Sequence, residues 1–143
     1  MNRNKSILVV LFAIVLATAA CGRDEGRPGT TAAGQRADVT VHEIQLGNQV
    51  DMGKSITTPM EVFSPSDTVY VSVRTSGVSA GTRLTARWTY EGGQVVDETS
   101  ETISTDGVTE FHISKPDGWP AGNYRVDILV NGQSKASKNF QVR

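Results

Sequence analysis

The chain contains one cysteine, Cys21, and its surroundings define its chemistry better than those of any other side chain. It directly follows the apolar run Ile7–Leu16 and the small-residue stretch Ala17–Ala20. A cysteine thiolate is a nucleophile that can carry a covalently attached group. A lone cysteine cannot close a disulfide within its own chain, so in an exported protein this thiol needs another explanation.

Other residues of the kinds that catalyse reactions or bind metals are few. His42 and His112 each lie in a strand-like run, and neither has a second ligand at the spacing of a metal site. The sequence has no Gly-x-Ser-x-Gly motif, and no predicted helix offers its N-terminus to an oxyanion hole. We therefore assign no metal, no cofactor and no catalytic residue.

An acidic stretch brings together Asp97, Glu98, Glu101 and Asp106. Such a group could form a weak calcium site or an acid–base pair. Calcium loops, however, place their oxygen ligands at close, regular spacing around a glycine. The solvated outer face of a strand accounts for these residues without a special role, and this is the interpretation we adopt.

Trp119, between Gly118 and Pro120, is the aromatic residue best placed to contact a partner. An exposed ring in this loop would offer a platform to a sugar, a peptide or a lipid headgroup. The alternative is a lid that folds over the end of the domain, which is favoured because large aromatic side chains are mostly buried. Trp119 is therefore a candidate partner contact with a structural alternative.

The start of the chain has the layout of a signal peptide over residues 1–20. Arg3 and Lys5 form a positively charged beginning, and Ile7–Leu16 is uninterrupted apolar sequence. An apolar segment of roughly 7–15 residues is typical of an exported leader, whereas a membrane-spanning helix needs roughly 18 or more. The sequence therefore predicts a leader that is cleaved, not a retained transmembrane anchor.

Small residues leading to a single cysteine, as in Leu16–Cys21, resemble the lipobox of bacterial lipoproteins. The resemblance covers residues 1–21. It implies that Cys21 becomes the first mature residue and carries fatty acyl chains such as palmitate, of which two or more give stable membrane attachment. It also implies the cell envelope. Gly22 stands where an aspartate would favour the inner membrane, so the outer membrane, facing the periplasm or the surface, is expected in a two-membrane host.

Thr18 departs from this pattern, because a typical lipobox has Leu, Val or Ile three places before the cysteine. Residues 17–19 also fit the A-x-A cleavage site of ordinary signal peptidase. Cleavage there would release a soluble protein that begins at Ala20. Both routes stay open from the residues alone, and lipidation is the one we prefer.

Residues 21–38 have the composition of a flexible tether, rich in glycine, threonine and scattered charges. They cannot bury enough apolar surface to offset the entropy lost on ordering. As a coil they would hold the domain on the order of 20–25 Å from a membrane. Loss of Arg3 and Lys5 with the leader takes the net charge from −1 to near −3. No basic stripe remains, so nucleic acid is not an expected partner.

From residue 39 to residue 143 the dominant period of the apolar residues is two, which is typical of strands. Apolar and polar residues alternate over 69–74, 84–90 and 124–130. Each run therefore turns one face toward a core and the other mostly toward water, as antiparallel sheets do.

Turn signals separate these runs. They lie at Ser64–Asp67, at Gly92-Gly93 and at Asn131-Gly132, and a longer loop is expected over Lys115–Gly122. About seven strands joined by short turns are typical of a β-sandwich. The sequence therefore predicts an all-β domain over residues 39–143.

Two aromatic residues give this domain a likeness to immunoglobulin-like folds. Trp88 lies mid-strand on an inward face, as a buried tryptophan does in those domains. Tyr124 opens a late strand, at the place of their tyrosine corner, and Gly118–Val126 resembles the entry to that strand in many bacterial modules. The resemblance implies an Ig-like antiparallel β-sandwich of about seven strands, without the disulfide of antibody domains.

Together these features predict a membrane-anchored envelope lipoprotein that binds or scaffolds an envelope protein or glycan and is not an enzyme. The contact would be made by loops at the ends of the sandwich or by an edge strand. Two alternatives stay open. One is an inhibitor or chaperone-like module that applies the loop Lys115–Gly122 to an envelope enzyme, and the other is an enzyme with an unrecognised site. The likeness to small bacterial lipoproteins adds no activity.

Overall fold

The computed structural model describes residues 38–143. The predicted signal peptide, Cys21 and the predicted tether up to residue 37 lie outside the described residues. Among the described residues, no helix is long and apolar enough to cross a membrane.

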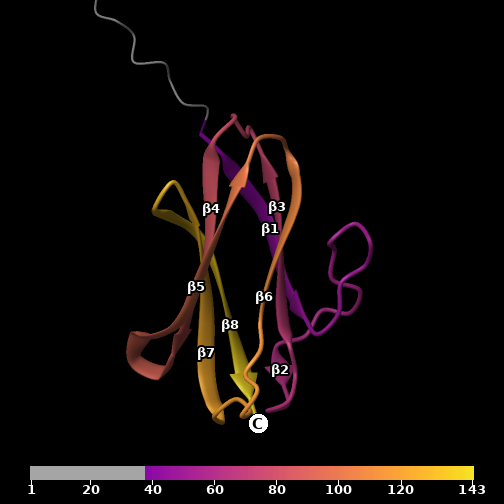
Figure 1. The fold of residues 1–143 in the computed structure, drawn as a ribbon, viewed down its shortest axis with the longest axis vertical. Coiled ribbons are helices and arrows are strands. Elements are labelled where there is room, and N and C mark those ends of the chain that lie inside the picture. The colour runs from indigo at the N-terminus through magenta and orange to yellow at the C-terminus, as the bar shows by residue number, and fades with distance from the viewer. Residues whose placement is uncertain (1–37) are drawn as a thin grey trace, which may run out of the picture. The chain divides into compact units, whose positions relative to one another are not determined.

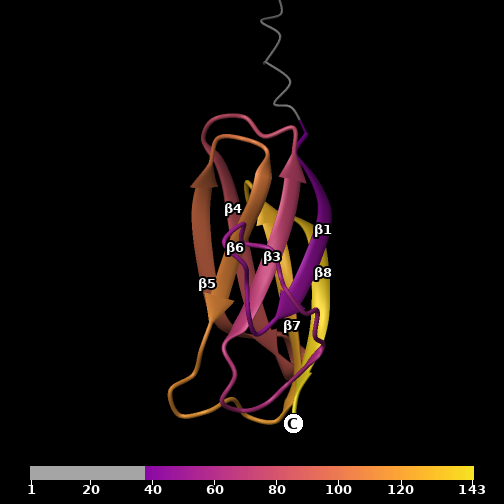
Figure 2. The same ribbon diagram turned by 90° about the vertical axis from the view of Figure 1, so that its right-hand side faces the viewer.

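Eight strands and one 3₁₀ turn form two β-sheets that pack face to face (Figures 1 and 2). The elements are β1 (Thr40–Gly47), β2 (Val62–Phe63), β3 (Val69–Ser76), β4 (Thr82–Tyr90), η1 (Glu91–Gly93), β5 (Gln94–Ile103), β6 (Gly107–Ile113), β7 (Gly122–Val130) and β8 (Gln133–Val142). One sheet has the order β1-β3-β6 and the other the order β2-β8-β7-β4-β5. Every pair is antiparallel except β2 with β8. The predicted all-β sandwich is confirmed.

Alternate residues of the central strands make the core between the sheets. Successive residues of a strand point to opposite sides, so β3, β4 and β7 each send every second side chain inward. Each valine, leucine or isoleucine buried in this way stabilises the fold by about 1.5–3 kcal/mol. The side chains of these three strands with no exposed surface are Val69, Val71, Val73, Leu84, Ala86, Trp88, Val126 and Ile128.

Trp88 lies at the centre of this core, as its place in the sequence predicts. Its ring meets Phe140 of β8 edge to face, with centroids 6.0 Å apart. Phe140 in turn meets Phe63 of β2 edge to face at 5.5 Å. Edge-to-face pairs add about 0.5–1.5 kcal/mol to the effect of burial. The aromatic contacts therefore fasten the short strand β2 to the centre of the sheet.

The predicted turns are present. Asn131 and Gly132 have φ values of 50° and 85°, as the favoured two-residue hairpin turn requires, and they join β7 to β8. The backbone N–H of Asp67 donates to the carbonyl of Ser64 at 3.0 Å, which closes the turn before β3. Gly92 and Gly93 lie in η1, where the chain reverses from β4 into β5.

Strand β2 is the element that the sequence analysis did not predict, since two residues are too short to show a period. It pairs in parallel with the end of β8. The N–H of Gln141 donates to the carbonyl of Glu61 at 2.8 Å, and the N–H of Arg143 to that of Phe63 at 3.1 Å. The sandwich therefore has eight strands where about seven were expected.

The two ends of the sandwich carry different segments (Figures 1 and 2). The described chain begins at one end, where Lys135 Nζ donates to Asp38 Oδ1 at 2.8 Å. At the other end lie η1, the loop 114–121 and the C-terminal Arg143, and we call this the distal end. The predicted tether therefore joins the domain opposite its distal end.

Candidate functional site

Trp119 is buried at the distal end and is only 3% exposed. Its indole Nε1–H donates to the carbonyl of Asp67 at 2.8 Å, and its backbone N–H donates to the carbonyl of Pro65 at 2.8 Å. The ring packs edge to face against Tyr124 with centroids 5.2 Å apart. Trp119 thus occupies the lid position that the sequence analysis favoured, and it does not present an exposed ring to a partner.

Tyr124 forms the corner that its position at the start of β7 predicts. Its phenol O–H donates to the carbonyl of Pro120, four residues upstream, at 2.7 Å. This is the hydrogen bond of a tyrosine corner in immunoglobulin-like domains. Burial raises the pKa of the Tyr124 phenol, and the negative charges of ionised Tyr90 and of Glu91 add to the effect.

The raised pKa predicts a loss of stability in alkali. The folded domain holds the Tyr124 proton more tightly than the unfolded chain does. Its contribution is therefore complete below about pH 10, where the unfolded chain also keeps the proton, and is lost as the pH rises through the folded pKa. We expect Tyr124→Phe to cost about 0.5–1.5 kcal/mol near neutral pH and to flatten the decline above about pH 10. Urea unfolding of both proteins across this pH range measures the difference, and parallel alkaline curves would contradict it.

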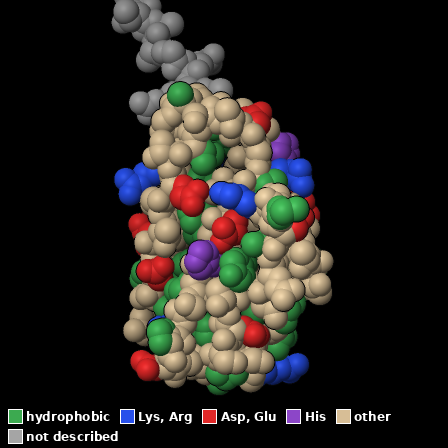
Figure 3. Space-filling view, turned by 45° about the vertical axis from the view of Figure 1, so that its right-hand side comes forward, with side chains coloured by type: hydrophobic (Ala, Val, Ile, Leu, Met, Phe, Trp, Pro, Cys, Tyr) green, Lys and Arg blue, Asp and Glu red, His purple; other side chains and the backbone are tan. Residues whose placement is uncertain are grey.

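The two histidines stay apart, as Figure 3 shows at two separate places on the face that it draws. His42 of β1 shares a hydrogen bond of 2.5 Å with the hydroxyl of Ser76. His112 Nδ1 lies 2.6 Å from Glu110 Oε1, and its ring lies against Tyr70 with centroids 5.2 Å apart. Within residues 38–143 no group of three or more His, Cys, Asp or Glu side chains could hold a metal ion.

Glu98 and Asp106 of the 97–106 stretch have separate structural partners. Glu98 Oε2 accepts from Arg87 Nε at 2.6 Å, across the β4–β5 pair. Asp106 Oδ1 accepts the backbone N–H of Val78 at 2.8 Å, between two loops. These carboxylates therefore do not converge on one point, in keeping with the solvated-face interpretation.

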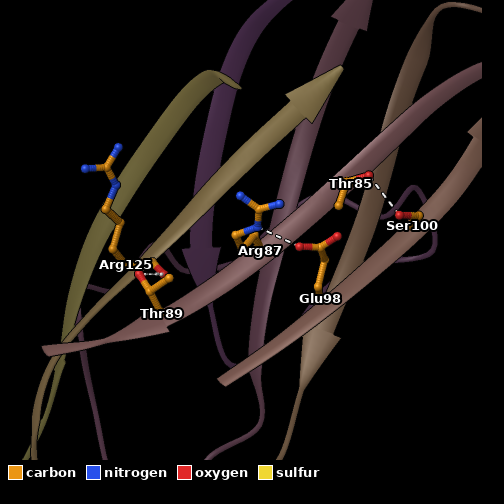
Figure 4. Close-up of polar contacts among 6 residues, drawn as sticks. All are labelled: Thr85, Arg87, Thr89, Glu98, Ser100 and Arg125. Atoms are coloured by element: carbon orange, nitrogen blue, oxygen red, sulfur yellow. Dashed lines mark hydrogen bonds and ion pairs between the residues drawn. The ribbon is translucent and has the colours of Figure 1, made fainter. Parts of the chain in front are cut away.

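The outer face of the five-stranded sheet carries a band of paired polar side chains (Figure 4). Besides the Arg87–Glu98 pair, the hydroxyls of Thr85 and Ser100 lie 2.8 Å apart and also bridge β4 and β5. Exposed ion pairs contribute about 0–1 kcal/mol. In Figure 4 the guanidinium of Arg125 points away from this band.

Beside this band, toward the distal end, the same face is hollowed by an open depression of about 730 Å³. We call it the β7–β8 hollow. Strands β4, β7 and β8 line it, and β2 and η1 border it. Its outward polar side chains on these three strands are Thr89, Asn123, Arg125, Asp127, Asn139 and Gln141.

Three side-chain amides line part of the hollow. Asn123 of β7 lies opposite Gln141 of β8, and Arg125 lies opposite Asn139 in the next row of the same register. Within residues 38–143, none of the three amide groups is taken up by a hydrogen bond to another part of the domain. An amide offers both donors and acceptors. The hollow therefore presents three amide oxygens and three amide nitrogens that are free to hydrogen-bond to a ligand.

The border at η1 depends on a glycine. Tyr90 O–H donates to the carbonyl of Ala121 at 3.1 Å, and Glu91 Oε1 accepts the N–H of Asn123 at 3.4 Å. Gly122 lies under both side chains with φ 150°, and a Cβ there would come within 2.6 Å of the Tyr90 ring. A glycine at position 122 therefore lets η1 lie against β7 and close one side of the hollow.

Sequence analysis did not identify this hollow. Its polar residues follow the alternation of β7 and β8, which is also what an ordinary solvated face shows. The one signal in the sequence is the choice of residues, since Asn123 and Asn139 stand on strands, where asparagine is depleted relative to β-branched and aromatic residues.

The domain is similar to an immunoglobulin-like protein from Pseudomonas aeruginosa. The TM-score is 0.58 and the sequence identity is 18%, over 77% of this chain and 100% of that one. The fold is immunoglobulin-like. The buried Trp88 and the corner hydrogen bond of Tyr124 agree with this immunoglobulin-like fold.

Two other similar structures are enzymes. One is the alkylpurine DNA glycosylase AlkC of Pseudomonas fluorescens, with a TM-score of 0.49 and 16% identity over 75% of this chain and 31% of that one. The other is a β-glucosidase from Listeria innocua, with a TM-score of 0.44 and 10% identity over 70% of this chain and 16% of that one. No protein-family model and no curated protein matches the chain. The comparisons therefore bear on the fold and not on an activity.

Proposed function

We propose that the protein is a lipid-anchored component of the bacterial cell envelope that binds another envelope component and catalyses no reaction. Cys21 carries the lipid, residues 22–37 act as the spacer, and the immunoglobulin-like domain makes the contact. The single observation that carries the binding role is the β7–β8 hollow with its unfilled amides.

The position of the hollow supports the assignment of anchoring and binding to different segments. The tether joins the domain at Asp38, next to Lys135. The hollow is bordered by η1, which lies at the distal end in Figures 1 and 2. Attachment to a membrane and binding at the hollow therefore use different parts of the domain. Both can occur at once.

The charged groups of the hollow favour binding over catalysis. Asp127 Oδ1 is held by Arg125 Nη2 at 2.6 Å and by its Nε at 2.9 Å, and Glu61 Oε1 lies 3.5 Å from Lys138 Nζ. General acid–base catalysis needs a proton-transferring group free to reach the substrate. Here Asp127 and Glu61 are engaged separately with cations, and the third carboxylate, Glu91, accepts the backbone N–H of Asn123.

A photo-crosslinking residue tests the binding role in intact cells. We expect a diazirine-bearing residue in place of Asn139 to form a defined adduct with an envelope component. The same residue in place of Arg74, exposed on the outer face of the three-stranded sheet, is the matched control and should form none. Gel mobility and mass spectrometry identify the adduct. Equal capture from both positions, or none from Asn139, would refute the proposed contact.

A further inference from the structure

We infer that the β7–β8 hollow binds an uncharged glycan, a short run of pyranose units within an envelope polysaccharide. This inference deepens the proposed function and rests on it.

The hydrogen-bonding groups of the hollow match sugar hydroxyls. Each hydroxyl both donates and accepts, and so does each side-chain amide of Asn123, Asn139 and Gln141. The β7–β8 register places Asn123 beside Gln141, with Asn139 in the adjacent row. Strand residues two apart on one face are separated by about 6–7 Å. The amides thus form a patch at least as long as one pyranose ring.

The charge of the hollow argues against a polyanionic ligand. Its one guanidinium, Arg125, is committed to Asp127 at 2.6 Å. Glu61 and Glu91 add negative charge at the border, and of these Glu61 is paired with Lys138. Phosphate-rich polymers and nucleic acids require an excess of cations. An uncharged saccharide needs none.

A small apolar border adds contact for the ring faces of a sugar. Val62 of β2 is 38% exposed at the edge of the hollow, and the half-buried ring of Tyr90 borders it near η1. Pyranose rings have apolar C–H faces, which aromatic and aliphatic groups cover. The border is small and open beside the well-packed, desolvated pockets that hold Trp, Tyr and Arg at the centre of most protein–protein interfaces. It therefore favours a glycan over a polypeptide.

The test is an NMR titration of the full chain, purified in a zwitterionic detergent that has no sugar headgroup. The probes are chitotetraose, cellotetraose and maltotetraose, with tetra-alanine as a peptide probe. We expect at least one tetrasaccharide to shift the side-chain amide signals of Asn123, Asn139 and Gln141 saturably. Asn139→Ala and Gln141→Ala should each weaken that binding about fivefold, the value of one neutral hydrogen bond. Ser134→Ala, on β8 beyond the hollow, should leave it unchanged.

Two results would overturn the inference. One is the absence of saturable shifts at these amides with all three sugars up to roughly 10 mM, in a protein whose other signals show the native fold. The other is a shift with tetra-alanine alone, which would assign the hollow to a polypeptide. A specific adduct from position 139 in cells, together with either result, would leave the binding role standing without a glycan. Failure of both experiments would remove the binding role as well.

Discussion

A Cys21→Ala variant is expected to leave the membrane fraction almost completely. The proposed lipid would be attached through a thioether to the Cys21 sulfur, and alanine offers no sulfur for that bond. Each buried CH₂ of an acyl chain contributes about 0.8 kcal/mol, so a diacyl anchor holds a protein at a bilayer far more firmly than one chain does. The remaining chain has no strong basic segment near the domain that could substitute by electrostatic attraction.

Detergent phase partitioning and mass spectrometry of the mature N-terminus measure this effect. The wild type should enter the detergent phase and begin at an acylated Cys21, whereas the variant should stay in the aqueous phase or keep its leader. Thr18→Leu is the informative control, because it supplies the residue type that a lipobox usually has at this place. It should leave the wild-type result unchanged.

A different mature terminus would decide against the anchor. If the wild type begins at an unmodified Ala20, cleavage has followed the Ala17-Thr18-Ala19 route and the protein is released. Conversion of that product to the acylated form by Thr18→Leu would identify Thr18 as the cause. The domain would then bind its partner as a released protein and not as a membrane-anchored one.

The β-sandwich could be predicted because the patterns that specify its strands and turns lie among neighbouring residues of the sequence. Alternation over β3, β4 and β7 requires only neighbours in the sequence, and the Asn131-Gly132 turn is specified by two residues with positive φ. Trp88 and Tyr124 could be assigned because each has a fixed place within a strand. The structure confirms both positions.

The parts that could not be predicted depend on contacts between distant segments. Strand β2 exists because Glu61 and Phe63 supply carbonyls to the end of β8, far along the chain. The partner of the Trp119 indole, the carbonyl of Asp67, is 52 residues away. The hollow arises where η1 and β2 border an ordinary polar sheet face. A pattern among neighbouring residues does not predict how segments far apart in the sequence come into contact.

Trp119→Ala is expected to lower the free energy of unfolding by about 3–5 kcal/mol, the range for a large aromatic truncated in a core. The ring contacts both Tyr124 and Phe140, at centroid distances of 5.2 and 6.3 Å, and its Nε1–H holds the turn that carries Asp67. Its loss would open a cavity at the distal end and release the loop 114–121. For a domain whose total stability is typically about 5–15 kcal/mol, this is a large fraction.

Trp119→Phe separates packing from hydrogen bonding. It keeps an aromatic ring and removes the indole donor, so we expect a loss smaller than that of Trp119→Ala, on the order of 1–3 kcal/mol. Urea unfolding followed by circular dichroism measures both variants. A change within about 0.5 kcal/mol for Trp119→Ala would show that the ring is dispensable for folding. That result would favour the alternative in which the loop Lys115–Gly122 inhibits an envelope enzyme. An aromatic ring that does not stabilise its own domain is available to contact a partner.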